Sequence, residues 1–127
     1  MVKIKSKTIV FCDEGEDDWN QYFKREFDHA EIEFENLQVF DSPDAFNQSF
    51  EILMFDWGGM SMGNSMLDHF TRRIYKLAEE NPSKDFILLS RFTERAYEDM
   101  LAGGHEKLHN IYSAEKWIDL MDHSHKK

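Results

Sequence analysis

The amino-acid sequence predicts an α/β fold, a doubly wound parallel sheet of five strands with helices on both faces. Short apolar stretches of strand length alternate with amphipathic stretches of helical length, and strict alternation of this kind favours parallel strands joined by helices. Two apolar stretches, 52–55 and 86–89, lack polar alternation, which is typical of strands covered on both faces. With 127 residues, the chain has the size of one domain. We expect a single domain over 1–127, with its core at about 8–123.

The first predicted strand is the apolar run 8–12, which ends at an acidic pair, Asp13 and Glu14. Aromatic residues spaced three and four apart indicate a helix over 16–27. These residues are Trp19, Tyr22, Phe23 and Phe27. The stretch 30–40 alternates apolar and polar residues like a half-buried strand, with an irregularity at Asn36.

The middle of the chain carries clear helix signals around the third strand. Ser42 can cap a short helix of about 43–50, which starts with a proline and an acid. The third strand, 52–55, stops at Asp56 and is followed by a glycine-rich loop. A helix over 65–80 begins with a capping-box pattern at Ser65 and stops before Pro82. Its predicted apolar stripe is Leu67, Phe70, Ile74, Leu77 and Ala78.

The last third of the chain repeats this alternation. The fourth strand, 85–90, ends at Ser90, and Thr93 can cap a helix over 94–102 that two glycines terminate. The fifth strand, 110–112, is short. Ser113 then caps the last helix, 114 to about 123. The apolar side of this helix holds Trp117, Ile118 and Met121.

Composition narrows the function classes. The chain has 15 Lys and Arg against 25 Asp and Glu, a formal charge of −10, so it lacks the basic face that binds nucleic acid. The single cysteine, Cys12, excludes an internal disulfide and a cysteine-based zinc site, which fits a reducing compartment. No apolar run approaches a membrane span or the core of a signal peptide. We expect a cytoplasmic protein that binds neither nucleic acid nor membrane.

Polar side chains stand where three predicted strands end. Asp13 and Glu14 follow the first strand, Asp56 the third and Ser90 the fourth. In a doubly wound sheet these strands are neighbours, and binding and chemistry collect at their carboxyl ends. Carboxylates suit Mg²⁺, which would neutralise an incoming phosphoryl group. Asp56 could then form an acyl phosphate while the Ser90 hydroxyl donates to a phosphoryl oxygen. The alternative is that acids at strand ends simply meet solvent.

With these residues in place, the chain resembles the receiver domain of two-component response regulators, a flavodoxin-like module. The resemblance covers about 8–123, and the loop 56–64, DWGGMSMGN, is similar to the family's Asp-x-x-Met-Pro-x-Met-Asp-Gly. It implies that Asp56 is the phosphoacceptor and that Ser90 contacts the phosphoryl group. The implied ligands of Mg²⁺ are Asp13, Glu14, Asp56 and the backbone carbonyl of Gly58.

The fifth strand departs from the family's pattern. Receivers end this strand with Lys-Pro, whose lysine pairs with the phosphoryl group, whereas 111–114 read Ile-Tyr-Ser-Ala. Ser113 is more simply a helix cap, and Lys116 lies one turn further on. Without a fixed cation, only metal, hydroxyl and backbone donors stabilise the phosphoryl charge. The alternative is therefore a degenerate receiver, a pseudo-receiver that binds or inhibits partners without a phosphate switch.

The resemblance implies a stand-alone signalling domain rather than an enzyme. Its partner would be a protein, either a histidine kinase or a downstream target, bound at about 94–121. Candidate contact residues are Tyr97, Tyr112 and Trp117, although Trp117 fits the core equally well. The enzyme alternative is a small aspartate-nucleophile phosphatase, but both Asp13 and Asp56 lack the second acid of the Asp-x-Asp pair that such enzymes use. Nothing in the sequence selects a kinase, a pathway or an oligomeric state.

Overall fold

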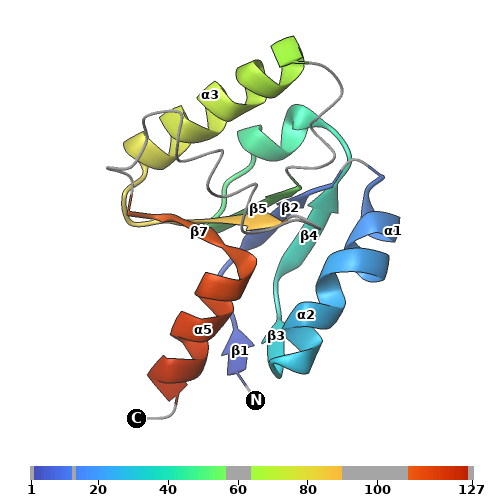
Figure 1. Ribbon diagram of the computed structural model, residues 1–127, viewed down its shortest axis with the longest axis vertical. Helices are drawn as coiled ribbons and strands as arrows, with labels where there is room; N and C mark the ends of the chain where they lie inside the picture. The colour runs from blue at the N-terminus through green and yellow to red at the C-terminus, as the bar shows by residue number, and fades with distance from the viewer. Residues whose placement is uncertain (1, 13, 57–63, 90–108, 126–127) are drawn as a thin grey trace.

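Five strands of the protein pair in parallel, and helices cover both faces of the resulting sheet (Figure 1). The computed structural model describes residues 2–12, 14–56, 64–89 and 109–125, of which 64–71 and 123–125 are described by their backbone alone. The strand order is β4-β2-β5-β6-β7. Counted along the chain, this is the order 2-1-3-4-5 of flavodoxin-like folds, so the predicted fold class is confirmed. Within the described residues, no helix is long and apolar enough to cross a membrane.

Strand β5 (Ile52–Asp56) forms the centre of the sheet. It pairs with β2 (Thr8–Phe11) on one side and with β6 (Asp85–Leu89) on the other. All five residues of β5 are buried, which confirms the prediction of a strand covered on both faces. The outer strands are β4 (Leu37–Phe40), next to β2, and β7 (Ile111–Ser113), next to β6.

The helices divide the core into two layers (Figure 1). Helix α3 (Asn64–Glu80) and the short 3₁₀ helix η2 (Pro43–Asn47) lie on one face, whereas α5 (Ala114–His125) lies with the first helical region on the other. Alternate residues of β5 enter the two layers because successive strand side chains point to opposite faces. Leu53 packs in the layer of α3, and Met54 in the layer of α5.

The first helical region contains a π-helical segment that the sequence did not predict. It consists of α1 (Glu16–Asp18), the π segment η1 (Trp19–Phe23) and α2 (Lys24–His29). Trp19, Phe23 and Phe27 are all buried and lie four residues apart. An α-helix turns slightly too far for this spacing, whereas a wider turn holds residues four apart closer to one line. The predicted helix over 16–27 is otherwise confirmed.

The predicted strand over 30–40 is two strands. β3 (Ile32–Phe34) pairs in parallel with β1 (Val2–Ile4), a strand that the sequence did not predict, and β4 joins the main sheet. The division falls at Asn36, the predicted irregularity. Between the two pairings, residues 5–7 stand opposite residues 35–36, so the register shifts by one position. This shift keeps Ile32 and Phe34 of β3 in the same core layer as Leu37 and Val39 of β4.

Several predicted boundaries move by a few residues. The second helix ends at Asn47 rather than about residue 50, and α3 begins at Asn64, so that Ser65 lies within its first turn. The fifth strand begins and ends one residue later than predicted. The Ser42 hydroxyl accepts the Asp44 N–H at 3.4 Å, which confirms that predicted cap. The predicted helix over 94–102, with Thr93, lies outside the described residues.

One buried side chain ties α3 to the β6–β7 pair. The amide nitrogen of Asn110, which is 7% exposed, donates to the carbonyl oxygens of Ala78 at 3.0 Å, Asn81 at 3.0 Å and Lys84 at 3.1 Å. These carbonyls belong to the end of α3 and to the turn that leads into β6. Removing the amide would leave them without that donor, in a place with little access to water.

We therefore expect Asn110→Ala to lower the free energy of unfolding by about 1–3 kcal/mol. Urea denaturation followed by circular dichroism measures this change. The matched control is Asn20→Ala, because Asn20 is exposed and its replacement should change stability by no more than about 0.5 kcal/mol. Equal effects of the two substitutions would show that the Asn110 side chain does not hold the turn in place.

Candidate functional site

Asp56 closes the central strand at the carboxyl edge of the sheet, the edge at which the parallel strands end. It is the last residue of β5, stands opposite Leu89 at the end of β6, and is only 5% exposed. Burying a carboxylate there costs free energy unless hydrogen bonds or positive charges replace its lost hydration. Asp56 is therefore a buried acid at the sheet edge where this fold places its chemistry. Ser90 follows Leu89 in the chain and lies outside the described residues.

The loop after β2 lies at the same edge. Cys12 is fully buried and its N–H donates to the carbonyl of Phe40 at 3.0 Å. Gly15 then turns the chain with φ 64°, a conformation that glycine adopts without strain, and its N–H donates to the carbonyl of Cys12 at 3.0 Å. Glu14 is exposed, and Asp13 lies outside the described residues. The loop is therefore folded back tightly onto the end of its own strand.

A second buried acid, Asp18, holds this loop and was missed by the sequence analysis. Asp18 is 5% exposed, and its Oδ2 accepts the backbone N–H of Glu14 at 3.1 Å. It lies in the first turn of the helical region, where a negative charge interacts favourably with the helix dipole. The one signal for it in the sequence is its place beside Trp19, on the buried side of the predicted helix. Without that signal, the three consecutive acids at 16–18 indicate a solvent-exposed start of a helix.

Both buried acids act on the thiol of Cys12. Burial raises the pKa of the Cys12 thiol, and the negative charges of Asp56 and Asp18 raise it further. Asp56 ends β5 and Asp18 begins the helical region, so both elements bring charge to the end of β2. The thiol stays protonated near neutral pH and is a poor nucleophile. The described part of the site is therefore two carboxylates beside a neutral thiol.

The oxygen atoms at this edge fit the preferences of Mg²⁺, which takes one or two carboxylates directly and keeps several waters. Asp56 and Asp18 supply buried carboxylates, and Glu14 supplies an exposed one. Across the described ranges, no three His, Cys, Asp or Glu side chains gather as a ready-made metal site. Asp13 and Gly58, the other implied ligands, lie outside those ranges. The predicted set of ligands therefore stays a prediction.

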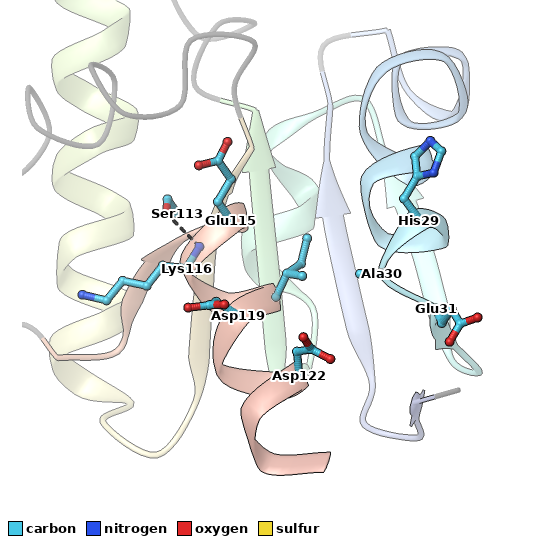
Figure 2. A pocket seen from close by; sticks show the side chains of 9 residues that line it. His29, Ala30, Glu31, Ser113, Glu115, Lys116, Asp119 and Asp122 are labelled. Carbon is cyan, nitrogen blue, oxygen red and sulfur yellow. Dashed lines mark hydrogen bonds between the residues drawn. The ribbon is translucent and has the colours of Figure 1, made fainter. Parts of the chain in front are cut away.

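The end of the fifth strand is occupied by a helix cap. The Ser113 hydroxyl accepts the backbone N–H of Lys116 at 3.2 Å, which confirms Ser113 as the predicted cap of α5. Lys116 itself is exposed, and Figure 2 shows its side chain extending to the side of α5 that faces away from α2. The last residue of the fifth strand thus caps the helix, and Lys116, one turn further on, extends away from α2.

Trp117 is a core residue, so its alternative assignment to a partner surface is wrong. Its side chain is 1% exposed, stacks on Phe34 with ring centroids 5.9 Å apart, and donates through Nε1 to Oδ2 of Asp85 at 3.0 Å. Tyr112 is half-buried, and Tyr97 lies outside the described residues.

Comparisons of the chain with protein-family models, with curated proteins and with solved structures found no match.

The buried thiol makes stability depend on pH in a predictable direction. In the unfolded chain Cys12 ionises near its ordinary pKa of 9.0, whereas in the folded chain it stays protonated well above that value. Its contribution to stability is therefore fully present below pH 9.0 and is lost as the pH rises further. We expect the free energy of unfolding to fall by about 1.4 kcal/mol per pH unit above pH 9 from this group alone.

Urea denaturation of the native chain and of Cys12→Ala at successive pH values isolates this slope. The comparison is cleanest below pH 10.0, the ordinary value of Tyr75, because burial raises the pKa of Tyr75 to about 12 and adds a similar trend there. The Cys12→Ala chain should lose less stability over this interval. Parallel curves for the two chains would show that Cys12 ionises as freely in the folded state as in the unfolded one.

Proposed function

We propose that this chain is a receiver-like signalling domain in which Asp56 accepts a phosphoryl group with the help of Mg²⁺. The observation that carries the proposal is a carboxylate only 5% exposed at the carboxyl end of the central strand of a 2-1-3-4-5 sheet. An acid at that position faces the edge where such sheets bind ligands. The domain does not turn over a substrate of its own. Its output is a change in protein contacts.

The proposed step is attack of an Asp56 carboxylate oxygen on the phosphorus of a phosphodonor. A bond forms between that oxygen and phosphorus, the bond to the donor's leaving group breaks, and the leaving group departs with the bonding pair. Bound Mg²⁺ supplies the positive charge that offsets the phosphoryl oxygens. The chain's own contribution is position. Asp18 holds the backbone of the neighbouring loop through the Glu14 N–H, so that the loop stays fixed beside Asp56.

Phosphorylation would change the charge at a buried place, which is why it can act as a switch. The carboxylates of Asp56 and Asp18 already raise the pKa of Cys12, so added negative charge at this edge would interact with nearby buried groups. A phosphoryl group brings further negative charge to this edge and must recruit cations and hydrogen-bond donors. Ser90, one residue beyond β6, is the proposed hydroxyl donor. Loops beside Asp56 that respond to the new charge would carry the signal to partner proteins.

A second candidate function is a pseudo-receiver that works through protein contacts without phosphate. The observation that favours it is the end of β7, where Ser113 caps α5 and Lys116 lies exposed rather than turned toward the sheet edge. With no fixed lysine there, a phosphoryl group loses one source of stabilisation. In this version Asp56 has a structural role only, and the chain binds or inhibits its partners in a single conformational state.

Beryllofluoride with Mg²⁺, a mimic of an acyl phosphate, distinguishes the two candidates by NMR. For the phosphorylated version we expect saturable shifts of amide signals at Cys12, Glu14 and Asp56, together with Ser90, and no shift in Asp56→Asn. Asp119→Asn is the matched control, because Asp119 is an exposed acid on α5 and its loss should leave the shifts unchanged.

Absence of shifts in the native chain at millimolar Mg²⁺ would overturn the phosphorylated version and leave the pseudo-receiver. The same samples test the phosphatase alternative. Steady release of phosphate from a generic phosphomonoester, abolished by Asp13→Asn, would replace both signalling versions with an enzyme.

A further inference from the structure

A groove of about 730 Å³ lies between α2 and α5, on the side of the sheet that carries the layer of Trp117 (Figure 2). The end of α2 and the residues just after it form one wall, and the first three turns of α5 form the other. Beneath the groove the two helices meet through Phe27 and Trp117, whose ring centroids are 6.1 Å apart. The groove therefore lies between two helices that pack on each other.

Acids are the largest group among the residues that line the groove. Its carboxylates are Glu31, Glu115, Asp119 and Asp122. Its lining also holds Lys116, which extends away from α2, and His29 (Figure 2). Four carboxylates therefore stand against one lysine, so the groove carries a net negative charge.

The two helices also confront each other with like charges. Burial raises the pKa of Glu26 on α2, and the negative charge of Glu115 on α5 raises it further, while Arg25 opposes both effects. Glu26 does not line the groove, but its carboxylate and that of Glu115 repel each other. A cation between the helices would relieve this repulsion. The electrostatics thus favour a positively charged occupant.

The floor of the groove adds an apolar component. Ile118 lies in the groove and packs against the buried layer, and Ala30 lies across from it at the end of α2. Lysine and arginine suit such a surface because their aliphatic stems lie on apolar atoms while their charged ends reach carboxylates. A nucleic acid or a second copy of this chain, with its charge of −10, would be repelled.

We propose that the groove between α2 and α5 is the docking site for a basic, Lys- or Arg-rich helical segment of a partner protein. The segment lays its aliphatic stems on Ile118 and pairs its cations with Glu115 and Asp122. The site lies on the helices rather than at the Asp56 edge, so it does not depend on phosphorylation. It applies equally to a receiver and to a pseudo-receiver. The net charge of the chain adds long-range attraction that speeds the encounter.

The test uses a synthetic helical peptide with Arg at helical spacings of three and four and Leu between them, titrated into the isotopically labelled full chain. Experiments at about 0.15 M salt screen long-range attraction and leave close pairs. We expect saturable shifts of amide signals at 29–31 and 115–122. Glu115→Lys combined with Asp122→Lys should weaken binding about tenfold or more. The milder pair Glu115→Gln and Asp122→Asn should weaken it less, and circular dichroism verifies that each variant is folded.

The matched control is Glu79→Lys with Glu80→Lys. Both residues are exposed at the end of α3, on the opposite face of the sheet, and the substitution changes the net charge by the same amount. This control should bind the peptide within about twofold of the native chain. Equal weakening by both double substitutions, or no saturable shift at the groove, would overturn the proposal. Asp56→Asn should bind as tightly as the native chain, which separates this result from a failure of the proposed phosphorylation.

Discussion

Burial of the whole of β5 is the constraint on which the rest of the structure depends. Four consecutive apolar residues, Ile52 to Phe55, are enclosed on both faces, and each contributes roughly 1.5–3 kcal/mol relative to an exposed position. Alternating side chains require cover on both sides, which α3 and η2 supply on one face and α2 and α5 on the other. The same enclosure continues to Asp56. The apolar residues thus contribute stability that offsets part of the cost of burying this carboxylate.

The central elements were predictable because their signals are local. A strand covered on both faces appears in the sequence as an uninterrupted apolar run. Between β3 and β4 the apolar positions change from even numbers, up to Phe34, to odd numbers, from Leu37, and this change marked the break between the two strands. β1 was harder to predict, because its alternation of apolar residues and lysines is too short to distinguish a strand from a chance pattern. Its partner, β3, lies about thirty positions away and supplies the pairing. Tertiary pairing therefore created a strand that local sequence did not indicate.

The residues of the candidate site show the same difference between local sequence signals and tertiary packing. Topology alone places the ends of β2 and β5 at one edge, so the sequence was enough to direct attention to Asp56. Asp18 was missed because its burial depends on how the helical region packs against the sheet, and its place beside Trp19 is only a weak signal of that packing. Trp117 had two possible environments on an amphipathic helix, and its aromatic neighbours Phe27 and Phe34 decided between them. Residues whose role is fixed by distant neighbours are those that sequence reasoning leaves open.

The path of the chain at the amino edge of the sheet has a practical consequence for assembly. β1 enters below the main sheet, and α5 runs back from the end of β7 toward the same end of the molecule (Figure 1). Val2 and Ile4 of β1 and Met121 of α5 even belong to the same core layer. A tether or a fluorescent label attached to β1 or to the second half of α5 would therefore lie on the side of the sheet away from the end of β5.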